Sequence, residues 1–191
     1  MADRLRLFVA LDPPPEIGAA LGRALESVRA VAPDERWSRT ESLHLTLSFL
    51  GHLPGETLDE VRAALAAASA GRAPFPIRVR GAGVFGRGAR ARVLWLGIEG
   101  GEALSSLQAA IVRELGAIGH REDRPYHPHL TLARSRDPRG SRALVDAQAL
   151  LASLDFGSFV VREVVLYRSE LGRGGSRYTP LATFPLASPG D

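Results

Sequence analysis

The tetrapeptide His44-Leu45-Thr46-Leu47 occurs a second time as His129-Leu130-Thr131-Leu132. Successive side chains of an extended strand alternate between its two faces. In each copy, therefore, histidine and threonine share one face and the two leucines share the other. The leucine face can pack into a core while the other face lines a cleft. If the copies belong to related halves, two imidazoles and two hydroxyls meet across that cleft.

Helical patterns surround both copies. Apolar residues spaced three or four apart predict four amphipathic helices, within residues 17–28, 58–68, 104–118 and 144–154. One helix precedes each tetrapeptide and another follows it. Alternating or β-branched runs predict strands over residues 4–11, 43–50, 75–85, 93–98, 159–166 and 178–186, besides the second tetrapeptide. Asp12, followed by three prolines, marks the start of the first helix, with Asp12 or the prolines supplying its cap.

This order indicates a duplicated α+β fold. We expect a single bilobal domain over residues 1–191, with approximate halves 1–86 and 92–186. The Gly/Arg-rich segment 86–92 is the expected boundary between them. The expected architecture is a pseudo-two-fold pair of antiparallel sheets that face each other across a central cleft, with the helices outside.

Composition narrows the chemistry. All 24 basic residues are arginine, and cysteine is absent, so lysine adenylation, Schiff bases, cysteine nucleophiles and thiolate metal sites are excluded. The formal net charge of +3 is modest, and guanidinium groups suit phosphate well. The short apolar runs predict neither a membrane span nor a signal peptide. A cytoplasmic protein is therefore expected. A monomer is expected because neither a heptad pattern nor an exposed apolar stripe indicates a partner.

Two histidines suit phosphodiester chemistry. Cleaving a P–O bond requires one group that removes a proton from the nucleophile and another that protonates the leaving oxygen. Histidine titrates near neutrality, so His44 and His129 can hold opposite protonation states at the same time. Thr46 and Thr131 can donate hydrogen bonds to the non-bridging phosphate oxygens. This chemistry requires no metal and no cofactor. In the competing interpretation, two Leu-x-Leu strands simply turn polar residues toward water.

Two further residues are candidate substrate ligands. Arg134 lies five residues after His129, an odd offset that turns it away from the site unless a strand end or bulge intervenes. His127 lies two before His129 and could share its face, although the intervening Pro128 complicates the geometry. His127 with His129 also suggests a metal centre, but the sequence offers no neighbouring cluster that would complete one.

Longer motifs carry a family resemblance. They are RLFVA at residues 6–10, LHLTLSFLG at 43–51, VLWLG at 93–97, PHLTLAR at 128–134 and LYRS at 166–169. Along nearly its whole length the chain resembles RNA 2',3'-cyclic phosphodiesterases of the LigT/ThpR type, in the two-histidine phosphoesterase superfamily with its His-x-Thr-x signatures. The resemblance implies a bilobal α+β fold with a central cleft.

The resemblance also implies an activity. Such enzymes open a terminal 2',3'-cyclic phosphate of RNA to a 2'-phosphomonoester without metal, and some members reversibly join RNA through a 2'-5' linkage. By resemblance His44 is the proton donor and His129 the proton acceptor, while Thr46 and Thr131 hold the phosphate. The residues alone give the pair of histidines but not this division of roles.

Other functions stay open from the sequence. The expected partners are RNA 3' ends or small cyclic nucleotides, with no membrane. An RNA-end binding module with little activity would use cleft arginines and exposed aromatics such as Trp37, Phe49 or Tyr178. A phosphodiesterase could instead act on ADP-ribose 1″,2″-cyclic phosphate or a 2'-5' oligonucleotide. A metal phosphoesterase would use His127 and His129.

Overall fold

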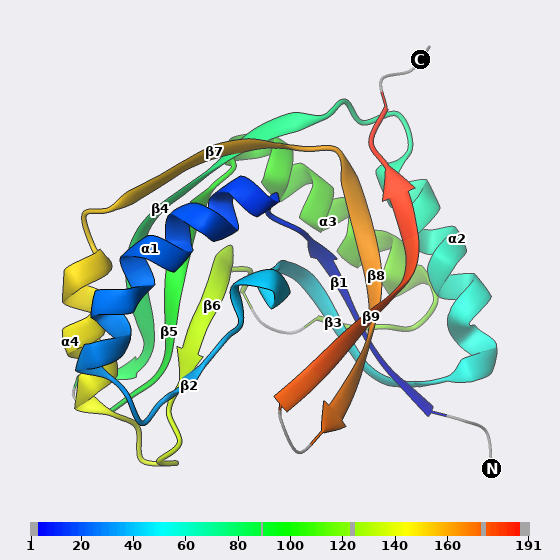
Figure 1. Ribbon diagram of the computed structural model, residues 1–191. Helices are drawn as coiled ribbons and strands as arrows, with labels where there is room; N and C mark the ends of the chain where they lie inside the picture. Colours follow the sequence, from blue (N-terminus) through cyan, green and yellow to red (C-terminus); the bar gives the residue numbers. More distant parts are fainter. Residues whose placement is uncertain (1–3, 89, 123–124, 173–174, 188–191) are drawn as a thin grey trace.

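A computed structural model describes residues 4–88, 90–122, 125–172 and 175–187 (Figure 1). Within these residues nine strands form one antiparallel sheet, in the order β7-β4-β5-β6-β3-β1-β8-β9, with β2 paired to β6. The strands are β1 (Arg4–Leu11), β2 (Arg36–Trp37), β3 (Leu45–Pro54), β4 (Phe75–Arg87), β5 (Arg90–Glu99), β6 (His129–Arg134), β7 (Asp155–Val161), β8 (Glu163–Gly172) and β9 (Gly175–Pro185).

The four predicted helices are present. They are α1 (Pro15–Val31), α2 (Leu58–Ser69), α3 (Gly101–Ala117) and α4 (Arg142–Leu151). Each buries most of the apolar stripe that predicted it, as Ile17, Leu21, Leu25 and Val28 do in α1, while Ile118 and Leu154, at the ends of two predicted stripes, are exposed. Helix α1 has Pro14 at its N-cap and no side-chain cap hydrogen bond. Of the two predicted sources of the cap, Asp12 is therefore wrong and the prolines are right.

The sheet curls so that two lobes form (Figure 1). We call β3, β1, β8 and β9 with α2 and α3 the His44 lobe, because α2 contacts β8 and β9 and α3 contacts β3. The His129 lobe comprises β6, β5, β4 and β7 with α1 and α4, because α4 contacts β4 and β5 and α1 contacts α4 and β7. Each half of the chain contributes to both lobes. Strand β4, from the first half, belongs to the His129 lobe, and strands β8 and β9, from the second half, belong to the His44 lobe.

The two lobes meet at a single residue pair. The register between β3 and β6 contains only Leu45 opposite Leu130 within the described residues. Beyond this point β2 replaces β3 as the neighbour of β6, with Trp37 opposite Ala133 and Arg36 opposite Arg134. The structure is therefore one curled sheet and not the two separate sheets that we expected. Alternation shows which residues share a face, but it does not show which strands pair.

Two local predictions differ from the structure. The single strand expected over residues 159–166 is two strands, β7 and β8, separated at Arg162. Strand β7 pairs with β4 at one edge of the sheet, whereas β8 pairs with β1 in the other lobe, so the chain crosses between lobes within one apolar run. The segment 86–92, expected as a boundary loop, forms the end of the β4–β5 hairpin, apart from residue 89, which lies outside the described residues.

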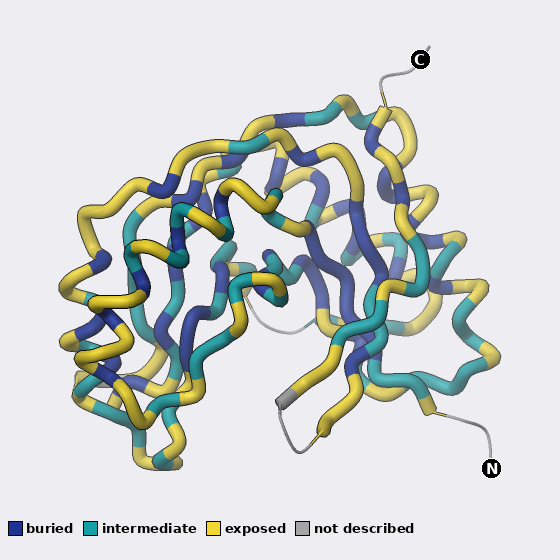
Figure 2. The backbone as a smooth tube through the Cα atoms, in the orientation of Figure 1, coloured by how far each residue is buried: buried dark blue, intermediate teal, exposed yellow. Residues whose placement is uncertain are grey.

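Buried residues concentrate between the sheet and its helices. Figure 2 shows the buried stretches along the central strands and on the inner sides of the helices, while the outer helix surfaces are exposed. The leucines of both tetrapeptides belong to this core, being Leu45, Leu47, Leu130 and Leu132. No helix among the described residues is both long and apolar enough to cross a membrane.

Candidate active site

The register at the junction of the lobes places the four polar side chains of the tetrapeptides on one face. Residues directly opposite each other in an antiparallel pair point to the same side. Because Leu45 lies opposite Leu130 and both are buried, their sequence neighbours point to the other side of the sheet, which we call the cleft face. Extending this register by one residue in each direction sets His44 against Thr131 and Thr46 against His129. The side chains of the two motifs are thus interleaved across the junction.

Both tetrapeptides end in a β-bulge at the same position. The β1–β3 register shifts between Val9 and Ala10, which leaves Leu47 without a partner in β1. The β5–β6 register shifts between Leu94 and Trp95, which leaves Leu132 without a partner in β5. In both strands the leucine and the residue after it are buried and the next residue is exposed. Such an extra residue reverses the alternation of faces beyond it.

The bulges bring two further side chains to the cleft face, Phe49 in β3 and Arg134 in β6. Arg134 lies opposite Val93, which shares its face of β5 with Trp95, and Trp95 lies opposite Thr131. From the sequence, Arg134 is expected to face the site only if a strand end or a bulge intervenes after His129. The structure contains such a bulge. Phe49, at the equivalent place, is 44 % exposed.

The two histidines are oriented by the same backbone contact. Nδ1 of His44 donates to the carbonyl oxygen of Ser42 at 2.9 Å, and Nδ1 of His129 donates to the carbonyl oxygen of His127 at 2.7 Å. A carbonyl oxygen can only accept, so Nδ1 carries the proton in each ring. This tautomer leaves Nε2 as the atom at which each ring can take up or release a proton.

Aromatic side chains enclose both imidazoles. The His44 ring lies 4.8 Å from the Phe8 ring and contacts the Tyr178 ring edge-on at 5.0 Å, between centroids. The His129 ring contacts the Phe85 ring edge-on at 4.9 Å. Both imidazoles are half-buried. Burial disfavours the charged ring, and for each histidine it is the largest cause that lowers the pKa from 6.5.

Other groups act differently on the two rings. The Ser42 carbonyl and the Asp12 carboxylate raise the pKa of His44 against the effect of burial, while Arg134 lowers it. The His127 carbonyl raises the pKa of His129, but the His127 ring, Arg134 and His44 all lower it. The guanidinium of Arg134 therefore acts electrostatically on both histidines, and the two rings lie close enough for His44 to affect His129.

Asp12 is one residue near His44 that the sequence did not single out as a site candidate. It follows Leu11, the last residue of β1, which lies opposite Leu45, so the chain places Asp12 beside His44. The hydroxyl of Tyr167, in β8, donates a hydrogen bond to Asp12 Oδ2. Burial is the largest cause that raises the pKa of Tyr167, and the hydrogen bond to Asp12 adds to it. No sequence signal identifies Asp12, because its place depends on the pairing of β1 with β3.

Trp95 lies close to both histidines of the His129 lobe, with its ring centroid 4.6 Å from that of His127 and 6.2 Å from that of His129. It lies opposite Gly83 of β4, and a Cβ atom at Gly83 would come within 2.2 Å of the indole atom Cζ2. Glycine at this position therefore gives the indole its room. The ring of Trp95 contacts the ring of His127 edge-on at 4.6 Å. His127 is itself exposed, and its carbonyl holds His129.

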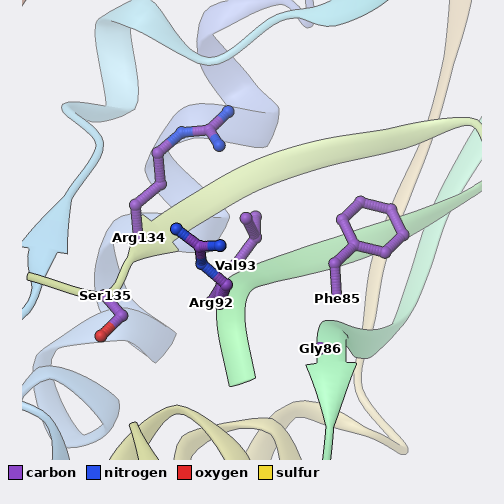
Figure 3. A pocket seen from close by; sticks show the side chains of 6 residues that line it. All are labelled: Phe85, Gly86, Arg92, Val93, Arg134 and Ser135. Atoms are coloured by element: carbon purple, nitrogen blue, oxygen red, sulfur yellow. The ribbon is translucent and has the colours of Figure 1, made fainter. Parts of the chain in front are cut away.

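A pocket adjoins His129. It has a volume of about 400 Å³, and Figure 3 shows the side chains that line it: Phe85, Gly86, Arg92, Val93, Arg134 and Ser135. Phe85 connects the pocket to the site, because its ring also contacts the His129 ring. Arg92 was not singled out by the sequence. It becomes part of the pocket because Ser135 N donates to the carbonyl oxygen of Arg92 at 2.9 Å, which sets the arginine beside the end of β6.

The other two histidines lie away from this cleft. His120 Nε2 is 3.5 Å from Oγ of the buried Ser48, and His52 is exposed near the end of β3, where its carbonyl accepts from Arg4. Within the described residues, no group of three or more histidine, aspartate or glutamate side chains is arranged to hold a metal ion.

Comparison with known proteins identifies the class to which this fold and site belong. The model of the 2'-5' RNA ligase superfamily matches residues 13–173. The chain belongs to this superfamily, and the resemblance found in the sequence is confirmed.

Individual relatives match the chain almost end to end. The RNA 2',3'-cyclic phosphodiesterase of Methanothermobacter thermautotrophicus is 34 % identical over 183 residues, covering 96 % of this chain and 100 % of the relative. The enzyme of the same name from Escherichia coli is 33 % identical over 197 residues, covering 97 % and 99 %.

Solved structures share the fold. A protein of Thermus thermophilus superposes with a TM-score of 0.80 at 31 % identity, covering 96 % of this chain and 98 % of that one. Escherichia coli LigT in complex with 3'-AMP superposes with a TM-score of 0.76 at 28 % identity, covering 97 % and 100 %. These proteins thus share the α+β fold described above, with its curled sheet and covering helices.

Proposed function

We propose that the protein hydrolyses the terminal 2',3'-cyclic phosphate of RNA to a 2'-phosphomonoester, using His44 and His129 as acid and base. The observation that carries the proposal is the matched pair of imidazoles on one cleft face, each with Nδ1 held by a backbone carbonyl and Nε2 left for proton transfer. The names of the relatives support the same reaction. We propose RNA 3' ends and small cyclic nucleotides as substrates.

The surroundings of the rings support the division of roles. The Asp12 carboxylate favours the protonated form of His44, whereas the charged neighbours of His129 disfavour its protonated form. His44 is accordingly the proton donor and His129 the proton acceptor. Tyr167 holds Asp12 in place through its hydroxyl. Asp12 is thus a positioning residue, because it acts on the phosphate through His44.

The proposed reaction balances with these two groups alone. Nε2 of His129 takes a proton from water as the water oxygen bonds to phosphorus. The bond between phosphorus and O3' breaks on the opposite side, and O3' takes the proton from Nε2 of His44. The phosphate stays on O2'. The pair returns to its starting state when a proton passes from His129 to His44 through solvent.

The phosphate is held by Thr46, Thr131 and Arg134. The pairing of Leu45 with Leu130 supports a threonine hydroxyl beside each histidine, where it can donate to a non-bridging oxygen. Arg134 reaches the same region, as its effect on the pKa of both histidines indicates. His127 contributes through its carbonyl, with its ring packed on Trp95. We propose no metal and no cofactor in this reaction.

The nucleoside is placed in the His44 lobe. O3' belongs to the ribose, so a ribose whose O3' faces His44 lies on that side of the phosphorus atom. There Phe8 contacts Phe49 at 6.0 Å and stacks on Tyr167 at 5.1 Å, between ring centroids. Phe49 is the exposed member of this row, and we assign it to stacking on the terminal base.

The pseudo-two-fold duplication belongs to the same proposal. Strands β6, β5 and β4 follow one another on one side of the junction as β3, β1 and β8 do on the other. The identical position of the bulges supports two related halves, approximately residues 1–86 and 92–186, that exchange their last strands. We propose that this single domain acts as a cytoplasmic monomer.

One experiment tests the reaction and its regiochemistry. RNA that ends in a 2',3'-cyclic phosphate is incubated with the protein in the presence of a chelator, and the product end is mapped. A 2'-phosphate formed in catalytic turnover is the expected result. A 3'-phosphate would contradict the assignment of the leaving oxygen to His44. Tight RNA-end binding without turnover under enzyme excess would favour the binding module instead, and loss of activity on chelation would favour a metal phosphoesterase.

A further inference from the structure

The pocket beside His129 lies where a second nucleophile would enter. In an in-line displacement the attacking oxygen approaches phosphorus opposite the leaving oxygen. With O3' at His44, the attacking oxygen lies at His129. Whatever is attached to that oxygen must continue away from the His44 lobe, along the side on which Phe85 contacts His129. When water attacks, this space holds solvent only.

Resting on the proposed function, we infer that this pocket is the subsite for an RNA strand bearing a 5'-hydroxyl, and that Arg92 binds the first internucleotide phosphate of that strand. The strand is the acceptor when a 2'-5' linkage forms and the released fragment when such a linkage is cleaved. Hydrolysis and ligation both act on a single phosphate between His44 and His129. Arg92 would bind the next phosphate along the entering strand.

The positions of the lining residues fit this strand. Phe85, Val93 and Arg134 lie opposite one another on three adjacent strands and so form a row on the cleft face. Arg92, the next residue along β5 from Val93, lies one step further from His129. Arg134 thus lies between the phosphorus site and Arg92. Figure 3 shows the guanidinium groups of Arg134 and Arg92 on the same side of the pocket, with Phe85 at its other end.

The charges of the pocket are unpaired within the described part of the chain. No carboxylate there forms an ion pair with Arg92 or Arg134, nor with Arg36, which lies opposite Arg134. Nearby arginines differ, since Arg139 pairs with Asp137 and Arg142 pairs with Asp146. Guanidinium groups without acidic partners suit phosphate groups of a nucleic acid backbone.

The size and lining suit a nucleotide. A volume of about 400 Å³ lies within the range of small-molecule sites, which begins at roughly 300 Å³. The Phe85 ring is 36 % exposed and offers a face for a base. The pocket therefore combines a stacking surface near His129 with charge further away, the order in which the first nucleoside and first phosphate of an entering strand would arrive.

The ligation step balances without a co-reactant. The 5'-oxygen bonds to phosphorus and gives its proton to Nε2 of His129. The bond from phosphorus to O3' breaks, and O3' takes a proton from Nε2 of His44, leaving a 2'-5' diester. In cleavage the 3'-hydroxyl attacks, its proton returns to His44, and the departing 5'-oxygen takes the proton from His129.

Three substrates separate this subsite from the hydrolytic site. The first is a 2',3'-cyclic mononucleotide, which places nothing in the pocket. The second is a 2'-5' linked dinucleotide, whose leaving nucleoside carries no phosphate. The third is a trinucleotide with a 2'-5' linkage followed by a 3'-5' linkage, whose leaving dinucleotide carries the phosphate assigned to Arg92. The kcat/KM of each is measured for the wild-type protein, Arg92→Ala and Arg92→Lys.

Arg92→Ala is expected to lower kcat/KM for the trinucleotide about tenfold or more while the other two substrates change by less than about twofold. Arg92→Lys should recover part of the loss. The matched control, Arg23→Ala, removes one exposed charge from α1 and should leave all three values unchanged. Equal loss on all three substrates, no loss on the trinucleotide, or a wild-type protein that hydrolyses the cyclic nucleotide but cleaves neither 2'-5' substrate would each overturn the inference. A wild-type protein inactive on the cyclic nucleotide would instead overturn the proposed function.

Discussion

The surroundings of His44 and His129 share a backbone and differ in side chains. Both rings donate from Nδ1 to a carbonyl two residues earlier, and both strands bulge at the last leucine of the motif. Yet a carboxylate lies beside His44, whereas His129 has only cationic or neutral neighbours among the groups that shift its pKa. The repeated backbone therefore sets the tautomer and orientation of each imidazole, while the side chains that differ between the lobes set the proton affinity of each ring.

The fifth residue after each histidine shows the same division. Phe49 and Arg134 occupy equivalent places after the bulges, and both are exposed on the cleft face. An aromatic ring suits a base and a guanidinium suits a phosphate. The same kind of bulge thus exposes an aromatic side chain in the His44 lobe and a guanidinium group in the His129 lobe.

The largest expected effect is the loss of either imidazole. His44→Ala and His129→Ala should each lower kcat for a 2',3'-cyclic nucleotide by a factor of roughly 100 to 10,000, because each removes one proton transfer. The double variant should be little worse than either single variant, since the pair acts as a unit. Steady-state kinetics measures the effect, and circular dichroism checks that the fold persists. Additive losses would show that the histidines work independently.

Replacing Arg134 or Phe49, the fifth residue after each histidine, by alanine should lower activity by unequal amounts. Arg134→Ala is expected to lower kcat/KM roughly 10- to 100-fold, because it removes charged hydrogen bonds to the phosphate. Phe49→Ala should raise KM for nucleotides by roughly tenfold and leave kcat nearly unchanged, because stacking acts on bound substrate and transition state alike. A loss of kcat in Phe49→Ala with KM unchanged would contradict the stacking role.

The Asp12 carboxylate should show itself in the pH dependence. Burial lowers the pKa of both histidines from 6.5, so kcat/KM of the wild-type protein should peak below pH 6.5. The donor must be protonated, so the pKa of His44 sets the alkaline limb of the profile. Because Asp12 raises that pKa, Asp12→Asn should move the alkaline limb to lower pH and leave the acid limb, set by His129, in place.

Tyr167→Phe tests how Asp12 acts. It removes the hydroxyl that holds the carboxylate but leaves the ring that stacks on Phe8. The alkaline limb should move in the same direction as in Asp12→Asn, by a smaller amount. A shift of the acid limb in either variant would assign the wrong histidine to the carboxylate.

The smallest expected effect is that of His127→Ala. The backbone carbonyl that holds His129 remains in this variant, so kcat/KM should fall by less than about threefold, as expected when only ring contacts are lost. Ser42→Ala is the matched variant in the other lobe, since the Ser42 carbonyl holds His44. A loss beyond tenfold in His127→Ala alone would give the His127 ring a direct part in the reaction.

The sequence predicted what depends on local pattern. The apolar spacing predicted the four helices, and the repeated tetrapeptide predicted which histidines and threonines share a face. The sequence could not predict the positions of Asp12 and Arg92, because both are set by strand pairing and not by any motif of their own. The division of residues 159–166 into β7 and β8 was also beyond it, since an apolar run looks the same whether its residues pair with one strand or with two.

The single pair Leu45–Leu130 has a mechanical consequence. Along this line the sheet has fewer paired residues than between any other neighbouring strands of the central order among the described residues, and the two nitrogens that the proposed reaction uses, Nε2 of His44 and Nε2 of His129, belong to residues next to this pair. The span between those nitrogens is therefore the dimension that backbone pairing constrains least. A phosphate bound by side chains of both strands, as proposed above, would link the two lobes across this junction, so substrate binding should make the junction more rigid.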